Sequence, residues 1–480
     1  MIELGTGLTY TLDLCPVVPA HTINDAGSVV HTAVHDVTIN GNGSTVTQTC
    51  AEERVMRNSH DMAEITLNDV TLTGGQVTEI AEGDDFEPIG GGGGLLSFGP
   101  ATLNNVTLNG NSSVQSGGGL RALIETNITG GSIFGNTSAA LGGAGGIDIG
   151  SGFSSAVPFL TMVGTSVTGN DPHGAVLRFG TNTITNSQLS SNIGRGVFAD
   201  HGNHDFTDST VDGKGGGGLV AIDGDFDLMN TTVTNNGDVG ITTTGSGDFT
   251  VDGGSISDNG SHAIDFVGCN ATEGQDNIVL SNTTVSGNAG WGINHGGCGN
   301  TIVTTTTISN NAGGIRCFEC ENVTVEFSSI TGNMPDGGID FRPGWESAGG
   351  ALLVRASQLT GNSSETDGGA IRAREGFDVN TSVTVSESSS ITDNTTTGRG
   401  GGIFAQGTTV VFGSVVSNNA TAGTFEDPGG EGGGIYVSGG DLSVTGGAVQ
   451  NNTADGSGGG ISHRGAGGYS IGISSTPITG

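Results

Sequence analysis

A short phrase recurs along the chain at a spacing that never falls below 22 residues. The phrase is an aliphatic residue, two small polar residues and then Asn, as in Leu108–Asn111, Val233–Asn236 and Ile308–Asn311. From Asn111 to Asn452 its last position defines thirteen intervals, of which six are 22 or 23 residues long. A fixed minimum with only additions above it indicates one structural turn that tolerates inserted loops.

A second phrase, Gly-Gly-Ile or a close variant, follows the first in most repeats, as in Gly145–Ile147 and Gly338–Ile339. Gly accounts for 92 of the 480 residues, and Val, Ile, Thr, Ser and Asn fill the intervals between glycines. Helix formers are scarce, and the regularly placed Leu of leucine-rich repeats is missing. Short strands that are separated by Gly and Asn turns and coil once per repeat predict an all-β, single-stranded parallel β-helix.

In such a solenoid each residue lies over its own copy in the next coil, about 4.8 Å away. We therefore expect the phrase-ending Asn amides to bond to one another in a column. Inward Ile and Val would fill a narrow core, and Gly would supply positive φ angles at the corners. About sixteen coils at this spacing predict a rod roughly 75 Å long.

The repeat resembles that of the right-handed parallel β-helix superfamily, which includes pectate-lyase-like enzymes. It is most similar to the Gly-Gly-Ala-Ile and Phe-x-x-Asn repeats of polymorphic outer-membrane proteins. Gly368–Ile371 fits the first motif, and Phe134–Asn136 is one residue short of the second. The resemblance covers about residues 35–470; it implies a right-handed coil and a role at the cell surface.

Residues 1–34 lack the Asn phrase, and we expect them to cap a repeat domain of residues 35–480, because an open coil end exposes unpaired strand edges. No signal peptide precedes them, so we expect a mature or excised region of a longer exported protein, located outside the cell or on its surface.

The charge is strongly one-sided, with 48 Asp and Glu against 13 Lys and Arg, a formal net charge of −35. Nucleic acid is excluded as a partner because such binding needs cations that neutralise phosphates. No run of about 18 apolar residues occurs, which excludes a membrane-spanning helix. An acidic chain with a single Lys suits a medium rich in salt or Ca²⁺, which screens the self-repulsion.

The six cysteines form an even set, which in an exported repeat protein predicts disulfides. The expected pairs are Cys15–Cys50, Cys269–Cys298 and Cys317–Cys320. A metal site at Cys317 and Cys320 is the alternative, although no second Cys-x-x-Cys accompanies it.

One column of predicted outward residues, those that follow Ile in the Gly-Ile phrase, is rich in charge. Five of the twelve Arg fall between residues 316 and 374, and Trp side chains lie nearby. Such a face is typical of oligosaccharide recognition, whereas alternating signs along the column equally predict a ladder of ion pairs. The candidate binding residues are Asp265, Trp291, His295, Arg316, Asp340, Arg342, Trp345, Arg372 and Arg374.

A second group of polar residues suggests an enzyme. It comprises Asp171-Pro-His173, Arg195, Asp200, His201, His204 and Lys214. His173 and Arg195 both lie three residues after the Asn of their repeat, so they should be neighbours on adjacent coils. Asp-Pro-His is similar to a motif of mannuronan C5-epimerases, a resemblance that implies proton transfer beside a uronic acid. A lyase or epimerase would use His173 or Arg195 as base and cations to stabilise the intermediate, with Asp171 and Lys214 beside them.

Asp223, Asp225 and Asp227 resemble a Ca²⁺ turn in composition, although an acidic turn explains them better. The sequence thus favours an extracellular adhesive or structural β-helix protein that binds glycans through a side face. A polysaccharide lyase or epimerase on the same fold is the alternative.

Overall fold

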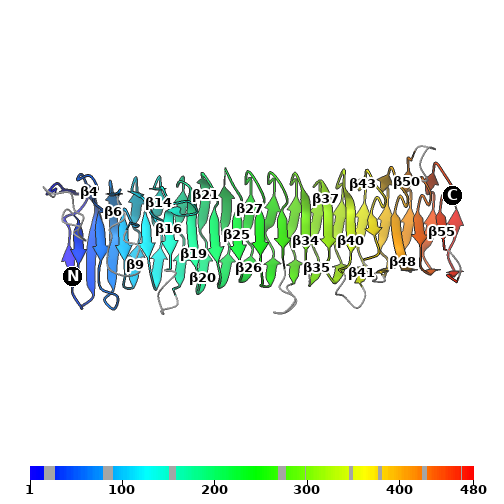
Figure 1. The fold of residues 1–480 in the computed structure, drawn as a ribbon, viewed down its shortest axis with the longest axis horizontal. Coiled ribbons are helices and arrows are strands. Elements are labelled where there is room, and N and C mark those ends of the chain that lie inside the picture. The colour runs from blue at the N-terminus through cyan, green and yellow to red at the C-terminus, as the bar shows by residue number, and fades with distance from the viewer. Residues whose placement is uncertain are drawn as a thin grey trace. The chain divides into compact units, whose positions relative to one another are not determined.

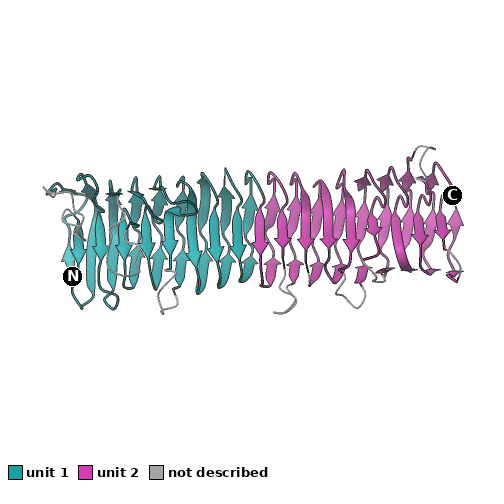
Figure 2. Cartoon of the chain, viewed as in Figure 1, with its two compact units in different colours: residues 1–238 teal, residues 239–480 magenta. Residues whose placement is uncertain are grey.

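The computed structural model describes residues 1–15, 28–78, 90–150, 158–213, 215–268, 277–297, 299–344, 350–376, 381–423, 430–465 and 468–479. Every regular element in these segments is a β-strand. The chain divides into two compact units, residues 1–238 and 239–480 (Figure 2). The expected boundary at residue 34 does not coincide with this division and stays a prediction.

Each repeat of unit 1 contributes strands to three rows, which we name in chain order the Gly–Ile row, the middle row and the Asn row (Figure 1). The Gly–Ile row comprises β3 (Val29–His31), β5 (Met56–Asn58), β8 (Leu95–Ser97), β12 (Leu120–Ala122), β16 (Ala144–Ile149), β19 (His173–Arg178), β22 (Val197–Asp200) and β25 (Leu219–Ile222). The middle row comprises β1 (Ile2–Glu3), β9 (Ala101–Asn104), β13 (Thr126–Thr129), β17 (Leu160–Val163), β20 (Thr181–Thr185), β23 (Asn203–Thr207) and β26 (Asp225–Met229). The Asn row comprises β2 (Thr9–Leu12), β10 (Thr107–Asn109), β14 (Ser132–Phe134), β18 (Ser166–Thr168), β21 (Gln188–Asn192), β24 (Thr210–Gly213) and β27 (Thr232–Thr234), and the long strands β4 (Val37–Gln48) and β6 (Ile65–Thr73) run through the last two rows.

Unit 2 has the same three rows. Its Gly–Ile row comprises β28 (Ile241–Thr244), β31 (Ile264–Val267), β34 (Trp291–Gly296), β37 (Gly313–Phe318), β40 (Gly337–Arg342), β44 (Ile371–Ala373), β51 (Ile435–Ser438) and β55 (Ile461–Arg464). The middle row comprises β29 (Phe249–Asp252), β32 (Ile278–Ser281), β35 (Asn300–Thr304), β38 (Asn322–Glu326), β41 (Gly350–Arg355), β45 (Thr381–Ser386), β52 (Leu442–Thr445) and β56 (Ile471–Ser474), and β48 (Ile403–Phe412) runs through both rows. The Asn row comprises β30 (Ser255–Ser257), β33 (Thr284–Ser286), β36 (Thr307–Ser309), β39 (Ser329–Thr331), β42 (Gln358–Thr360), β46 (Ser390–Thr392), β49 (Val415–Ser417), β53 (Ala448–Gln450) and β57 (Ile478–Thr479).

Strands within a row pair in parallel with the strands of the coils before and after them, so the predicted parallel solenoid is confirmed. Some turns contain two-residue strands that pair with one another in small separate sheets. These strands are β7 (Gln76–Val77), β11 (Ser112–Ser113), β15 (Thr137–Ser138), β43 (Ser363–Ser364), β47 (Thr395–Thr396), β50 (Ala420–Thr421) and β54 (Thr453–Ala454). Residues 2–12, which we expected to act as a cap, pair with β4 in the same parallel manner as a coil.

The core is a stack of inward aliphatic and Phe side chains, because alternate residues of a strand point to opposite faces. In β23 and β26 the inward Phe206 and Phe226 stack with ring centroids 6.0 Å apart. Both are fully buried, as are Ile293 and Ile315 in the Gly–Ile row of unit 2. Burial of apolar surface within each coil therefore stabilises the solenoid.

The phrase-ending Asn side chains form the predicted ladder in the interior. In unit 2 it links Asn259, Asn288, Asn311, Asn333, Asn362, Asn394, Asn419 and Asn452. Asn311 Oδ1 accepts hydrogen bonds from the backbone amide and the Nδ2 of Asn288, at 3.0 and 2.8 Å. Asn311 Nδ2 donates in turn to Asn333 Oδ1 at 3.1 Å and to the carbonyl of Val285 at 3.2 Å. Each buried amide is thus satisfied by the coils on either side of it.

The Gly of the Gly-Ile phrase is required because the Asn ladder leaves no space for a Cβ, not because the chain turns at that position. A Cβ on Gly146 would lie 2.3 Å from the carbonyl oxygen of Gly174 and 3.0 Å from Asn170 Nδ2. The inward Asn therefore leaves no room for a side chain where the next strand begins. Many corners at positive φ use Asn or Asp instead of the expected Gly, for example Asn105, Asn186 and Asp208.

Replacing Asn311 by Ala is expected to lower the free energy of unfolding by about 2–4 kcal/mol, because the buried N–H groups of Asn288 lose their acceptor. Urea unfolding followed by circular dichroism would measure the loss. Asn300→Ala is the matched control, since Asn300 also bonds to Asn residues of both neighbouring coils but is half-buried. Its expected loss is below about 1 kcal/mol. Equal losses for the two variants would contradict a special role for the buried ladder.

Candidate functional site

The charged column proposed from the sequence is in register along the Gly–Ile row of unit 2. The paired residues of successive strands are Thr242, Asp265, Asn294, Arg316, Asp340, Arg372, Phe404 and Tyr436. Gly296, Phe318 and Arg342 form a second column two residues further along the same strands. The phrase alignment therefore identified true neighbours across coils.

Asp340 is the centre of the column. It lies on the outer face of β40, yet only 3% of its surface is exposed. Arg372 donates from Nε to Asp340 Oδ1 at 2.9 Å and from Nη2 to Oδ2, so the pair is bidentate. Arg374 Nη2 donates to both carboxylate oxygens at 3.2 and 3.1 Å. One buried carboxylate thus fixes two guanidinium groups of the following coil.

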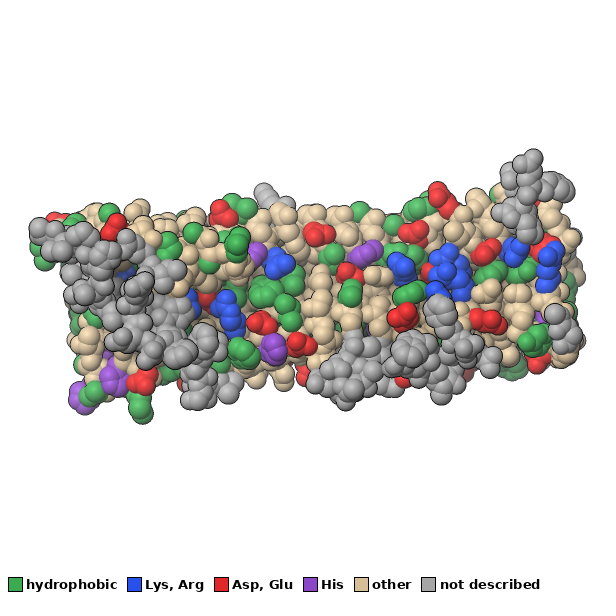
Figure 3. All heavy atoms as spheres, in the orientation of Figure 1, with side chains coloured by type: hydrophobic (Ala, Val, Ile, Leu, Met, Phe, Trp, Pro, Cys, Tyr) green, Lys and Arg blue, Asp and Glu red, His purple; other side chains and the backbone are tan. Residues whose placement is uncertain are grey.

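Two further arginines flank the carboxylate of Asp340. Arg316 lies on the strand of the preceding coil, and Arg342 lies on the same strand as Asp340. Their guanidinium carbons lie 5.9 and 5.2 Å from the ring centroid of Phe318, within the range of cation–π attraction. We name Arg316, Arg342, Arg372 and Arg374 the arginine cluster. Figure 3 shows Lys and Arg side chains gathered on one face, with acidic side chains around them.

Burial and neighbouring charges shift the pKa values of three side chains in and beside the cluster. Burial acts to lower the pKa of Arg372, but the hydrogen bonds and charge of Asp340 raise it overall. Burial lowers the pKa of Arg374; Asp340 opposes this effect, and the charges of Arg372 and Arg342 reinforce it. Burial also raises the pKa of Asp336 at the edge of the cluster. Burial is therefore the main reason that the pKa of Arg374 is lowered.

The structure corrects part of the proposed binding face. His295 is fully buried, its Nδ1 lies 2.8 Å from Thr301 Oγ1, and its ring meets Phe266 edge-on, so it packs in the core. Trp291 is also buried and covers Gly313. Asp265 accepts a hydrogen bond from Asn294 Nδ2 at 2.7 Å. Trp345 lies outside the described residues.

His173 and Arg195 are neighbours on adjacent coils, as their positions in the repeat predict. The backbone amide of Arg195 donates to His173 Nδ1 at 3.0 Å. Burial, and to a lesser degree the charge of Arg195, lowers the pKa of His173 from 6.5 to about 4. The ring is therefore neutral at pH 7, and its proton resides on Nε2 because Nδ1 accepts. A role for His173 as a base stays a prediction, and it would require Nδ1 to leave its amide partner.

The remaining members of this group are dispersed. Asp171 is half-buried in the turn before His173. Asp200 and His201 end β22 at the surface, and Lys214 lies outside the described residues. His204 is buried in the middle row, where its Nδ1 accepts from Asn182 Nδ2 and its Nε2 donates to the carbonyl of His201, both at 3.2 Å.

The proposed Ca²⁺ turn is not assembled. Asp225 and Asp227 lie on the exposed face of β26, and Asp223 lies at the preceding corner, 3.6 Å from the ring of His201. Within the described segments no three or more His, Cys, Asp or Glu side chains are arranged to hold a metal ion.

Two of the three expected disulfides are present. Cys15 bonds to Cys50 and Cys317 bonds to Cys320, with Cα–Cα distances of 5.1 and 5.7 Å. The second bond disfavours the metal alternative at the Cys-x-x-Cys segment. Cys269 and Cys298 lie outside the described residues.

One buried ion pair was missed from the sequence. Asp148 is fully buried on the outer face of β16 and bonds to Arg178 of the next strand. Asp148 follows Ile147 just as Asp340 follows Ile339, so alignment of the Gly-Ile phrases would have found it. Unit 1 therefore repeats the arrangement of a buried Asp clamped by an Arg of the following coil.

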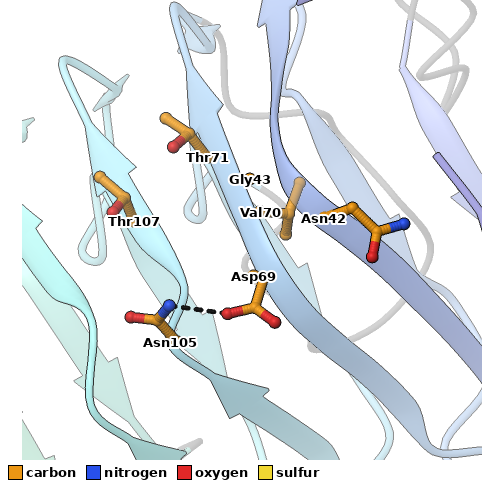
Figure 4. A pocket seen from close by; sticks show the side chains of 7 residues that line it. All are labelled: Asn42, Gly43, Asp69, Val70, Thr71, Asn105 and Thr107. Atoms are coloured by element: carbon orange, nitrogen blue, oxygen red, sulfur yellow. Dashed lines mark hydrogen bonds between the residues drawn. The ribbon is translucent and has the colours of Figure 1, made fainter. Parts of the chain in front are cut away.

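A shallow pocket of about 300 Å³ lies at a corner of unit 1, away from these groups (Figure 4). Asn42, Asp69 and Asn105 line it, all at positive φ, and Asn105 Nδ2 donates to Asp69 Oδ1 at 2.7 Å. It is an open corner with one carboxylate and no group suited to catalysis.

Comparisons with known proteins agree with the fold. Residues 195–363 match the family described as "Right handed beta helix region". This match covers about a third of the chain and agrees with the all-β parallel solenoid that the three rows of strands form. A solved structure of the periplasmic alginate epimerase AlgG is similar over 98% of this chain and 83% of that one, at 10% identity and a TM-score of 0.21. No curated protein matches the sequence. The described residues form no helix long and apolar enough to cross a membrane.

The buried histidines predict a pH dependence of stability. Burial lowers the pKa of His204 from 6.5 to about 4, so between these pH values the unfolded chain binds a proton that the folded chain does not. The stability that neutral His204 contributes is complete above pH 6.5 and is lost as the pH falls towards 4. His204→Asn is expected to reduce the loss between pH 7 and 4.5 by about 1–3 kcal/mol.

Urea unfolding at a series of pH values would measure this effect. His201→Asn, on the same coil but exposed, is the control and should keep the wild-type pH dependence. An unaltered pH profile in His204→Asn would show that another group is responsible.

Proposed function

We propose that this protein is an exported β-helix protein that binds acidic glycans through the arginine cluster, with an adhesive or structural role. One observation carries the proposal: the buried carboxylate of Asp340 holds Arg372 and Arg374 side by side, and Arg316 and Arg342 flank it against Phe318. A bound carboxylate or sulfate could accept hydrogen bonds from several of these guanidinium groups at once. The guanidinium fork matches such groups in bidentate geometry.

The surroundings of the cluster support the same ligand class. In a chain with only thirteen Lys and Arg, four Arg gather on β37, β40 and β44 and directly after β44, with the carboxylates of Asp336, Asp340 and Asp367 beside them. Asp340 holds Arg372 and Arg374 in place, so less conformational entropy is lost when a ligand binds. Phe318 offers an aromatic surface between Arg316 and Arg342. The straight column of stacked coils suits an extended polymer.

Export is supported by the covalent structure. Disulfides persist in oxidising compartments, and the described residues contain two. Solenoid units with a polar surface suit a protein at or outside the cell surface.

Arg316→Gln/Arg342→Gln is expected to weaken binding to uronate- and sulfate-bearing glycans by about tenfold or more, since each substitution removes a charge-assisted donor. The Asp340–Arg372–Arg374 bonds stay intact in this variant. A glycan array followed by titration calorimetry at two salt concentrations would measure the loss, and high salt should weaken the wild type.

Arg355→Gln is the control, because Arg355 belongs to unit 2 but pairs with Glu326 outside the cluster. Wild-type affinity in the double variant would assign the cluster a purely structural role as a ladder of ion pairs.

An acidic-polysaccharide lyase or epimerase is the second candidate, favoured by the contact between neutral His173 and Arg195. If it is correct, uronate polymers incubated with the protein yield unsaturated ends or residues inverted at C5, and His173→Gln abolishes the product. Ultraviolet absorbance and proton NMR would detect the two products. Asp208→Asn, at an exposed corner, is the control. Absence of both products with the wild type would retire this candidate.

A further inference from the structure

We propose a second glycan-binding site, in unit 1, that takes neutral sugars rather than acidic ones. It consists of Phe179, His201 and Asp223, which occupy the same corner in three successive coils, together with Asp200. We name these four residues the corner ridge. It is distinct from the arginine cluster in position and in ligand chemistry.

The backbone at this corner identifies the ridge. The residue that follows the Gly–Ile strand adopts a positive φ in several coils, and Gly fills this position at Gly150, Gly245 and Gly268. Phe179, His201 and Asp223 adopt φ values of 59°, 57° and 49°. Asp and His enter this region more readily than most side chains, whereas a bulky ring such as that of Phe is disfavoured there, so Gly would satisfy the fold better at position 179. The Phe179 ring is therefore the feature that indicates a purpose other than folding.

The four side chains form one connected and accessible surface. The rings of Phe179 and His201 lie 5.4 Å apart at an angle of 32°. His201 Nδ1 lies 2.8 Å from Asp200 Oδ1, and His201 Nε2 lies 3.6 Å from Asp223 Oδ2. Phe179 is 39% exposed, and the side chains of His201 and Asp223 are 52% and 39% exposed. The imidazole is thus held between two carboxylates beside an open aromatic ring.

This chemistry suits a neutral pyranose. An exposed aromatic ring accepts the apolar face of a sugar, and carboxylates accept hydrogen bonds from its hydroxyl groups. Asp200 and Asp223 repel uronate and sulfate groups. The nearby Arg178 does not reverse this preference, because the buried Asp148 binds it. The described residues around the ridge do not form a metal site either.

Phe179→Gly gives a direct test, because the substitution removes the ring and relaxes the backbone at once. Neutral and acidic oligosaccharides of matched length would be titrated against the full chain in the presence of EDTA. The wild type is expected to bind neutral oligosaccharides, and Phe179→Gly should bind them at least tenfold more weakly. Its thermal unfolding midpoint should be unchanged or higher, so lost binding would not reflect misfolding.

Phe327→Gly is the matched control, since Phe327 is also an exposed Phe at positive φ, 54% exposed with φ 50°. It should bind neutral sugars as the wild type does. Failure of the wild type to bind neutral sugars, or undiminished binding by Phe179→Gly, would overturn the proposal. Loss of acidic-glycan binding in Phe179→Gly would overturn the assigned ligand class. The Arg316→Gln/Arg342→Gln variant should retain neutral-sugar binding, so the result for one site does not decide the other.

Discussion

The buried column of Asn side chains is the constraint on which the rest of each unit depends. In unit 2 each amide from Asn288 to Asn419 bonds to the coil on either side, and a buried amide without partners is costly. Coils can vary in loop length, but they cannot shift register without breaking this column. The Gly of the next strand is fixed by the same column, as Gly146 shows, because the Asn amide occupies the space of a Cβ. The two sequence phrases are therefore two halves of one packing arrangement.

The register between coils determines which residues lie next to one another on the surface. Residues 22 or more positions apart, such as Arg316, Asp340 and Arg372, become immediate neighbours. A functional group on this scaffold is a column, and its chemistry is set by which residues follow a given phrase in successive repeats. The arginine cluster and the corner ridge are such columns with opposite electrostatic character.

Much of this could be predicted from the sequence, because a fixed period determines neighbours. The parallel coils, the Asn ladder, the column through Asp340 and the contact between His173 and Arg195 all follow from counting residues. Burial could not be predicted in the same way. Alternation shows that Asp340 points out of its sheet, but it does not show that two arginines of the next coil cover it.

Other features depend on three-dimensional detail that periodicity does not contain. His295 follows inward alternation and packs on Phe266, although its neighbours in sequence suggested a surface role. The proton on His173 is placed by a single backbone amide, a contact that depends on the conformation of the turn. The sequence singled out Asp200, His201 and Asp223 in two separate groups, but not Phe179 or their shared corner, because residue identity alone does not reveal a positive φ.

The Asn ladder also has a direction. In unit 2 each side chain from Asn259 to Asn419 donates towards its C-terminal neighbour, and each from Asn288 to Asn452 accepts from its N-terminal one. The amide dipoles therefore add head to tail instead of cancelling. A ladder opened between two coils would expose N–H donors on one face and amide oxygens on the other, so the two faces of a coil are chemically different.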